Sequence, residues 1–308
     1  MTGRPLGRTP HLGLLQVCAA GVLWGTGGLV VTLLHERDGL GAMTASAWRM
    51  VLAAAALVVF AVVTGRIRAA LATLRTHPWL VALVGCGTAV YQGLYFVSVL
   101  LAGVSVATVV SLGLAPVLAA IWEHATARTM PSGRDLGVLV AALVGLGLVV
   151  GGGTRTAIPE GGSPALGVIL AIAAGGTYAA TTLLGHRLAR RVDPVALTTS
   201  ATAVGAVALA PFLVVAAVEG QPVMTSSPAS LGLLIYLGVA TMALAYVLLY
   251  AGLRTTTGSA ATVATLVEPL SAAVLAVVLL GERPTAIAVV GGLLILAAVV
   301  ALRPSDTT

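Results

Sequence analysis

Long apolar runs that contain almost no charged residue are the feature that most constrains how this chain can fold. A helix that crosses a bilayer needs about 20 mainly apolar residues, and ten such helices would occupy most of a chain of 308 residues. Since 58% of the residues are hydrophobic and only 8% are charged, a water-soluble chain of this length could not bury so much apolar surface. The sequence therefore predicts an integral membrane protein.

Ten candidate spans are bounded by Arg, Pro, Gly or acidic residues. Five lie in the first half of the chain, at residues 12–33, 42–63, 79–101, 104–124 and 136–152. Five lie in the second half, at residues 165–185, 195–217, 231–252, 258–280 and 285–302. The segments between them leave no room for a soluble domain, so the predicted fold class is an all-α integral membrane protein with ten transmembrane helices.

The arginines predict the orientation, because basic residues in short loops are retained on the cytoplasmic side. All sixteen basic residues are Arg. If the N-terminus is cytoplasmic, the outer segments hold only Arg37, Arg155 and Arg283, and Arg49 lies within a span. The other twelve are then cytoplasmic: Arg4, Arg8, Arg66, Arg68, Arg75, Arg128, Arg134, Arg187, Arg190, Arg191, Arg254 and Arg303. Both termini are therefore predicted to be cytoplasmic. Arginines scattered between apolar runs do not form a nucleic-acid-binding face, and we expect no nucleic-acid partner.

The two halves of the chain match each other when one is shifted by about half its length. Trp24 aligns with Tyr178 at a shift of 154, Tyr91 with Tyr246 at 155, and Pro116 with Pro269 at 153. Because each half has five spans, an odd number, the second half must enter the membrane in the opposite sense. We therefore predict two inverted five-helix repeats, residues 1–153 and 154–308, an architecture typical of secondary transporters.

Several motifs resemble those of the EamA group of the drug/metabolite transporter superfamily. They are Leu23-Trp24-Gly25, Trp48-Arg49, Leu112-x-x-x-Pro116, Leu266-Val267-Glu268-Pro269 and Gly281-Glu282-Arg283-Pro284. The resemblance implies ten helices, an inverted repeat and transport of small metabolites, often efflux of amino acids or related compounds. The first half departs from the pattern, since it reads Arg128-Thr129-Met130-Pro131 where the Gly-Glu-Arg-Pro turn would repeat.

Glu268 falls near the middle of the ninth predicted span, where a carboxylate is costly and usually faces a bundle interior or a water-filled cavity. Its counterpart in the first half is Ala115. Two interpretations stay open. Glu268 is either a protonated acid that hydrogen-bonds a neighbouring helix, or a site for proton coupling or for a substrate amine.

Arg49 is predicted to lie about 10 Å below the outer surface, and Glu268 about 15 Å below it. These are the two most deeply placed opposite charges, so they could pair or bracket a zwitterionic ligand. Alternatively, the long Arg49 side chain extends toward the outer interface.

Aromatic and hydroxyl side chains share one face of the third predicted span, since Thr88, Tyr91 and Tyr95 follow helical spacing. Tyr246 and Tyr250 repeat that spacing in the eighth span. Together with the residues at positions 24 and 178, they predict an aromatic wall for a ligand cavity. Gln92 lies next to this face and is included in the predicted site. The alternative is that these aromatic residues gather at the membrane interface.

Pro116 and Pro269 predict helix kinks, because proline removes a backbone hydrogen bond and its ring clashes with the preceding turn. The carbonyls of Leu112 and Thr265 would then be free to meet water or a ligand. Kinks that serve packing alone are the alternative.

Small-residue pairs predict close helix contacts at Gly21 with Gly25 and at Gly147 with Gly151. We expect Glu123 to lie at the membrane interface.

Motifs for enzymatic chemistry are missing from the sequence. It contains no Lys, hence no phosphate-binding Gly-x-x-x-x-Gly-Lys loop, and its five histidines lie near span ends. We therefore expect no catalytic residues, no metal and no cofactor.

The leading hypothesis is a secondary transporter in the cytoplasmic membrane of a bacterium, with the bilayer and a small, amino acid-like solute as partners. It would work by alternating access, most simply as an exporter of amino acids or related metabolites, with proton coupling as an option. The alternatives are multidrug efflux of lipophilic cations and, from another class, a membrane sensor or intramembrane enzyme. The sequence leaves the substrate and the oligomeric state open.

Overall fold

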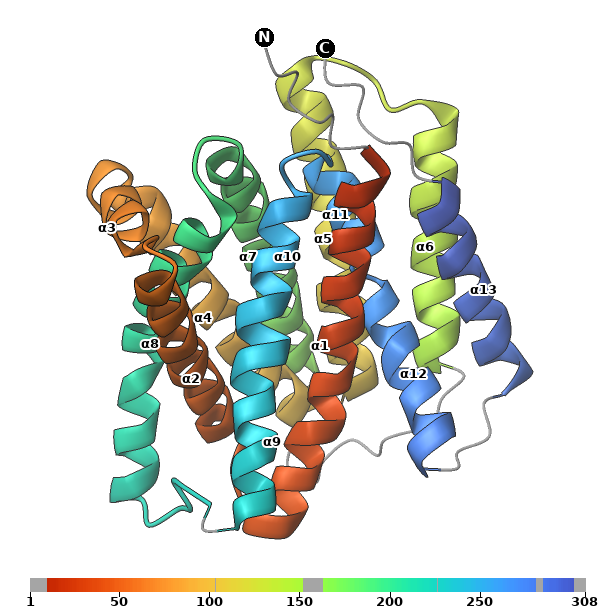
Figure 1. The fold of residues 1–308 in the computed structure, drawn as a ribbon. Helices are drawn as coiled ribbons and strands as arrows, with labels where there is room; N and C mark the ends of the chain where they lie inside the picture. Colours follow the sequence, from red (N-terminus) through yellow and green to blue (C-terminus); the bar gives the residue numbers. More distant parts are fainter. Residues whose placement is uncertain (1–9, 103, 152–162, 226, 281–284, 302–308) are drawn as a thin grey trace, which may run out of the picture.

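The computed structural model describes residues 10–102, 104–151, 163–225, 227–280 and 285–301, and every regular element in these ranges is a helix. Figure 1 shows them as one bundle of roughly aligned helices. Within the described ranges, nine stretches are long and apolar enough to cross a membrane, and residues 286–301 form a shorter apolar helix. The prediction of an all-helical membrane protein is confirmed.

The described residues of the first half form six helices. They are α1 (Pro10–Asp38), α2 (Ala42–Val63), α3 (Ile67–Thr76), α4 (Pro78–Ala102), α5 (Val104–Ala127) and α6 (Gly133–Gly151). The second half contains α7 (Pro164–Ala189), α8 (Pro194–Val218), α9 (Pro228–Gly238), the π-helix η1 (Val239–Leu244), α10 (Ala245–Gly252), α11 (Gly258–Ala264), α12 (Val267–Leu280) and α13 (Ala286–Ala301).

The predicted spans match these elements in place, with three differences. Helix α3 was not predicted, because it is amphipathic and a search for uncharged apolar runs passes over it. The eighth span is α9, η1 and α10 in succession, and the ninth is divided into α11 and α12 at Thr265–Leu266. The predicted repeat boundary at 153/154 and the Gly-Glu-Arg-Pro turn at 281–284 lie outside the described residues.

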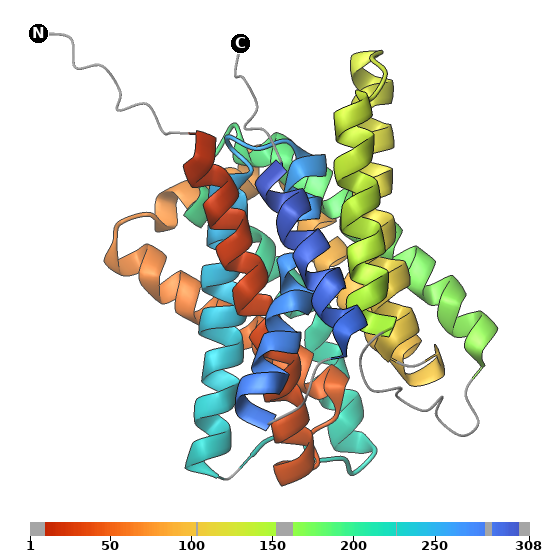
Figure 2. The same ribbon diagram turned by 90° about the vertical axis from the view of Figure 1, so that its right-hand side faces the viewer.

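The equivalent first helices of the two halves, α1 and α7, start at opposite ends of the bundle (Figures 1 and 2). Near the start of α1, Gly13 lies against residues 252–256, where α10 leads to α11. Near the start of α7, Gly167 lies against residues 101–102, where α4 ends. Since Gly13 and Gly167 are themselves 154 residues apart, the halves make the same contact with their roles exchanged.

A second exchanged contact lies nearer the middle of the bundle. A Cβ on Gly21 of α1 would lie 3.3 Å from the carbonyl oxygen of Thr265, and a Cβ on Gly175 of α7 would lie 2.6 Å from that of Ser111. Both steps, from Gly21 to Gly175 and from Ser111 to Thr265, are 154 residues. The repeat seen in the sequence is thus also a repeat of helix packing.

Helices α6 and α13 lie side by side at one side of the bundle (Figures 1 and 2). They meet at Gly145 and Gly291, where an added Cβ would lie 2.7 Å and 2.6 Å from the opposite glycine's carbonyl oxygen. The predicted close contact at Gly147 and Gly151 is wrong, since neither has a neighbour within 4 Å of an added Cβ. Gly147 is two residues from Gly145, which places it about 200° around the helix, on the face away from the contact.

Candidate substrate site

Aromatic residues from both halves meet in two groups inside the bundle. In one group, the rings of Trp24 and Tyr246 pack edge to face with centroids 5.2 Å apart, and Tyr250 lies 6.0 Å from Tyr246. In the other, Tyr178 stacks on Tyr91 at 5.0 Å, and Tyr95 lies 6.1 Å from Tyr91. The structure therefore brings together all six predicted aromatic residues.

The two aromatic groups are related by the repeat. Tyr178 is the counterpart of Trp24, and Tyr91 is the counterpart of Tyr246. The contact between Trp24 and Tyr246 is therefore the same contact as that between Tyr178 and Tyr91, with the two halves exchanged. Each group joins the first helix of one half to the third span of the other half. A movement of one half relative to the other would therefore change the contacts of these rings.

Glu268 lies in the first turn of α12 and is an electrostatic neighbour of tyrosines from both groups. Its electrostatic neighbours include Tyr91, Tyr178, Tyr246 and Arg49. The positive end of the helix dipole favours a carboxylate in a first turn, which reduces the cost of placing one inside the bundle. The side chain is half-buried.

Helix α1 packs directly on the backbone around Glu268. A Cβ on Gly25 would lie 2.5 Å from the carbonyl oxygen of Glu268 and 3.0 Å from the amide of Ala272. A side chain at position 25 would therefore collide with the backbone of α12. The close contact predicted for Gly21 and Gly25 is confirmed.

The chain is not helical between α11 and α12, and this changes the role predicted for Pro269. The Leu266 amide donates to the Val263 carbonyl at 3.1 Å, and the Glu268 amide donates to the Thr265 carbonyl at 2.9 Å. The Thr265 carbonyl therefore has a protein donor, and the expectation that it is free for a ligand is wrong. Pro269 is the third residue of α12, where a proline is tolerated because first-turn amides have no helical partner. Pro116, by contrast, lies inside the continuous helix α5.

The Arg49 side chain lies inside the bundle and hydrogen-bonds to the backbone of the second half. Its Nη2 donates a hydrogen bond of 2.8 Å to the Thr241 carbonyl, near the middle of the span that runs from Pro228 to Gly252. Its Nε is buried and has no hydrogen-bond partner among the described residues. Arg49 is also an electrostatic neighbour of Glu268.

Arg49 and Glu268 do not form a direct ion pair. Among the described residues, one ion pair is found within 4 Å. It joins Arg66 to Asp193 at 3.6 Å and involves neither Arg49 nor Glu268. The sequence suggested a direct pair or a bracket around a ligand. The structure shows no direct pair, and Tyr91 and Tyr246 are electrostatic neighbours of both charges.

Thr241 lies in the π-helix η1, which directly precedes α10, the helix that carries Tyr246. A π-helix closes its hydrogen bonds over one more residue than an α-helix, and such segments are frequent at functional sites. The sequence carried a signal for it: the repeat shift is 154 at Trp24 but 155 at Tyr91. One additional residue in the second half is what a π turn accommodates.

Gln92 is the polar side chain of the predicted site that most lacks partners. It is only 6% exposed, and neither Oε1 nor Nε2 has a hydrogen-bond partner in the described part of the chain. The neighbouring hydroxyls are satisfied: Tyr178 donates to Thr265 Oγ1 at 3.1 Å, and Thr88 donates to the Val84 carbonyl at 2.8 Å. A buried amide without partners is costly and calls for an explanation.

A cavity of about 590 Å³ opens elsewhere, between α5, α6, α11 and α13. Pro116 and Val263 lie on its walls, together with Glu123. None of the ten predicted substrate-binding residues is among the residues that line it. Sequence reasoning did not predict this cavity, because its walls come from two helices of the first half and two of the second, which are far apart in the sequence.

Glu123 ties the two halves together at this cavity. Its Oε1 accepts from the Gly258 amide at 2.6 Å and the Ser259 amide at 3.2 Å, and its Oε2 accepts from the Ser259 hydroxyl. The carboxylate thus satisfies amides of the first turn of α11. We expected Glu123 to be an interfacial residue, and a sequence with no indication of which helix faces which could not reveal this contact.

A family of known proteins matches both halves of the chain. The model of the EamA-like transporter family matches residues 11–151 and, a second time, residues 165–303. The chain belongs to the EamA-like transporter family. It is therefore a membrane transporter and not an enzyme.

Two relatives and one solved structure show how far the similarity extends. "Uncharacterized transporter YwfM" of Bacillus subtilis (strain 168) is 29% identical over 269 residues, 87% of this chain and 86% of the relative. An "Uncharacterized transporter" of Archaeoglobus fulgidus is 28% identical over 183 residues, 59% of this chain and 61% of the relative. A solved structure titled "Crystal structure of protein" has a TM-score of 0.77 at 18% identity, covers 94% of this chain and 95% of its own, and shows the fold alone.

Proposed function

We propose that this EamA-family transporter carries small zwitterionic solutes, amino acids or related metabolites, across the bacterial cytoplasmic membrane, and that it exports them by alternating access. The observation that carries the proposal is the placement of Arg49 and Glu268, two opposite charges inside the bundle that are electrostatic neighbours without an ion pair. A charge inside the bundle without an opposite charge beside it is costly, and a ligand with a carboxylate and an ammonium group supplies an opposite charge to each.

Each part of such a solute has a complementary group. A guanidinium binds a carboxylate through parallel N–H donors, and the Nε of Arg49 has no partner. Glu268 would take the ammonium group, and the surrounding tyrosines and Trp24 favour a cation and an apolar side chain. Gln92 can donate and accept hydrogen bonds with a further polar group of the solute. Export driven by protons would follow if Glu268 exchanged a proton for the ammonium group.

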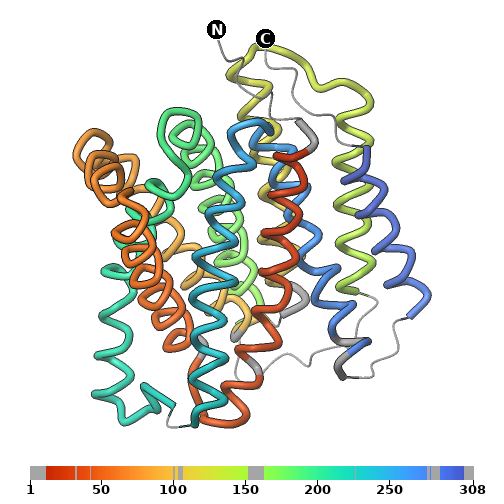
Figure 3. The backbone as a smooth tube through the Cα atoms, viewed as in Figure 1, coloured from red at the N-terminus to blue at the C-terminus, as the bar shows by residue number. Residues whose placement is uncertain are grey.

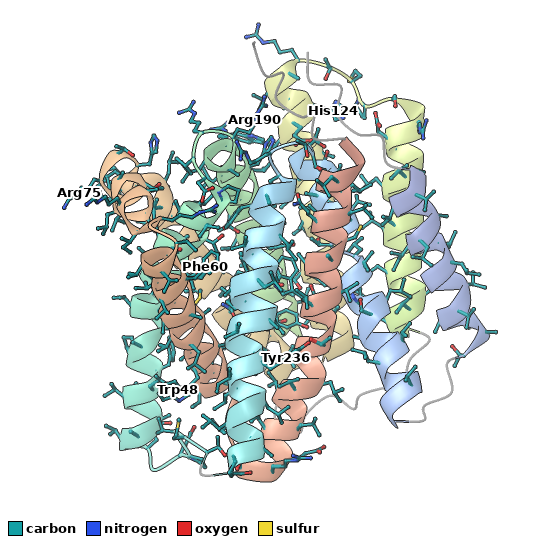
Figure 4. All side chains as sticks on the ribbon, in the orientation of Figure 1. Trp48, Phe60, Arg75, His124, Arg190 and Tyr236 are labelled. Carbon is teal, nitrogen blue, oxygen red and sulfur yellow. The ribbon has the colours of Figure 1, made fainter. Side chains whose placement is uncertain are left out.

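The orientation is part of the proposal. In the described ranges, nine arginines lie at the end where α1 begins: Arg66, Arg68, Arg75, Arg128, Arg134, Arg187, Arg190, Arg191 and Arg254. Arg37 lies at the opposite end. Figure 4 shows Arg75 and Arg190 at the first end and Trp48 near the other. The positive-inside rule makes the first end cytoplasmic, with ten spans in two inverted repeats and both termini inside.

The test is solute flux into proteoliposomes. A panel of labelled neutral, aromatic and hydroxy amino acids is compared with a cationic dye, with and without an imposed pH gradient. We expect saturable amino-acid exchange that falls roughly 10- to 100-fold in both Arg49→Gln and Glu268→Gln, since each loses a charge-assisted hydrogen bond. Glu219→Gln removes an exposed carboxylate at the end of α8 and serves as the control.

The second candidate, efflux of lipophilic cations, is favoured by the aromatic rings around a single carboxylate. The same experiment separates the two. Transport of a cation would depend on Glu268 and be insensitive to Arg49→Gln, because the dye has no carboxylate. Dye transport with that pattern and no exchange of any amino acid would replace the proposal.

A further inference from the structure

Helix α3 lies at the edge of the bundle, at the end where α1 begins (Figures 1 and 3). One face is fixed to α8: Ala70 and Thr73 are buried, and the Ser200 hydroxyl donates to the Ala70 carbonyl at 2.9 Å. The ion pair between Arg66 and Asp193 holds its N-terminal end. The position of α3 on the protein is therefore set by contacts, and its other faces are left outward.

One outward face of α3 is apolar. Leu71 is 47% exposed and Leu74 is 39% exposed, and residues three apart lie side by side on a helix. Trp79, which follows at the start of α4, is 81% exposed. Val62 and Val63 at the end of α2 are also exposed, so the apolar surface of a spanning helix is followed by the apolar face of α3. Tryptophan is enriched at the level of lipid headgroups.

The next face of α3 is basic. Arg68 and Arg75 are seven residues apart, which places them on the same side of the helix about 10 Å from each other. Figure 4 shows Arg75 extending away from the bundle. The described part of the chain gives neither arginine an ion-pair partner within 4 Å. Two unpaired guanidinium groups therefore border the exposed leucines.

We propose that α3 lies in the plane of the membrane interface and that Arg68 and Arg75 bind the phosphate groups of anionic phospholipids. Leu71 and Leu74 insert beside the acyl chains, as the apolar face of an interfacial helix does. The guanidinium groups then lie at headgroup depth, where their donors match phosphate geometry and anionic lipids attract basic residues. The surface therefore has the two properties that an anionic lipid requires, an apolar face beside the chains and cations beside the phosphates.

The first experiment measures binding of fluorescent phosphatidylglycerol and phosphatidylcholine to the full-length protein in mixed micelles. We expect phosphatidylglycerol to bind more tightly, and Arg68→Gln/Arg75→Gln to weaken it roughly 10- to 30-fold, from about a factor of five per arginine. Arg190→Gln/Arg191→Gln removes two exposed charges from the same end of the bundle and should leave the affinity within about twofold. Equal affinity for the two lipids, or an unchanged affinity in the α3 variant, would overturn the proposal.

The second experiment does not depend on the arginine variants folding. A polarity-sensitive fluorophore is attached to Leu74→Cys in a Cys18→Ala/Cys86→Ala background and the protein is placed in liposomes. We expect blue-shifted emission that brominated lipids quench, because this position faces the acyl chains. The same fluorophore on Ala72→Cys, about 160° around the helix, should report water. A fluorophore at position 74 that reports water would exclude an inserted α3.

Discussion

The third and fourth spans of each repeat differ between the halves. In the first repeat, α4 and α5 are continuous α-helices, and α5 runs through Pro116 without interruption. In the second repeat, the equivalent spans contain the π-helix η1 and the break between α11 and α12. The first repeat supplies Arg49, and the second supplies the Thr241 carbonyl that binds it and the first turn that carries Glu268.

Hydroxyl side chains show the origin of one difference. Ser111 donates to the carbonyl four residues earlier, Ala107, at 2.6 Å, which is compatible with a continuous helix. Its counterpart Thr265 donates to the carbonyl three residues earlier, Thr262, at 2.9 Å, and also accepts from Tyr178. Side-chain bonds to the backbone compete with the helical pattern. Equivalent positions in a duplicated fold thus keep their packing contacts while a local hydrogen bond changes the backbone.

The largest effect is expected from removing the extra residue of the π-helix. Deleting Val239, an exposed residue, should return the eighth span to α-helix, in which the Thr241 carbonyl accepts from the amide four residues later and no longer faces Arg49 as a free acceptor. Arg49 then loses its acceptor, and transport should fall at least tenfold, measured as flux into proteoliposomes. Val239→Ala is the matched control. A deletion variant with normal transport would mean that the π-helix has no role in the site.

A Cβ at Gly25 tests the close packing of α1 on α12. Gly25→Ala should lower the free energy of unfolding by about 1–3 kcal/mol, since the added carbon meets backbone rather than a flexible side chain, and transport should fall with it. The counterpart of Gly25 in the other repeat is already an alanine, buried Ala179. Ala179→Gly is therefore the control, with a smaller expected loss. Thermal unfolding in detergent measures the stability of both variants. An equal loss of stability in the two would mean that α1 does not pack more closely on α12 than α7 packs on its neighbour.

Gln92 separates stability from function. Gln92→Leu replaces a buried amide without partners by an apolar group, so the fold should be as stable or more stable, by about 1 kcal/mol. The affinity for the transported solute should fall several-fold at the same time. Thermal unfolding and the concentration dependence of flux measure the two quantities. Unchanged flux together with higher stability would exclude Gln92 from the binding site.

The two prolines should respond differently to replacement. Pro116→Ala restores an amide donor to the Leu112 carbonyl inside α5 and should stabilise the protein by about 1 kcal/mol. Pro269→Ala should change stability by less, because a first-turn amide has no helical acceptor. Thermal unfolding of both variants checks the difference, and an equal gain at the two sites would contradict the placement of Pro269 in the first turn of α12.

The positions of the membrane-spanning elements followed from the sequence because bilayer thickness sets a length that apolar runs must meet. The repeat followed as well, since equal residues recur at a nearly constant shift. Helix α3 did not, because it has only ten residues and four of them are Arg or Thr. Its structure depends on contacts with α8, such as that of Ser200 with the Ala70 carbonyl.

The candidate site was predictable in its residue types but not in its connections. The spacing of Tyr91 with Tyr95 and of Tyr246 with Tyr250 placed each pair on one helix face, and the cost of a buried charge singled out Arg49 and Glu268. Which helices face each other is decided by packing over long sequence separations. Only the tertiary structure therefore revealed that Trp24 of the first half contacts Tyr246 of the second half and that Glu123 caps α11.

The sequence by itself determined that the chain lies in a membrane, where its apolar runs fall, and that it is built twice. These properties depend on local composition and on self-similarity, which need no knowledge of contacts. Only the tertiary structure decided that Arg49 binds a carbonyl of the opposite repeat, that Glu268 begins a new helix, and that α6 meets α13 at Gly145 and Gly291. Those outcomes depend on which backbones approach closely enough to exclude a side chain.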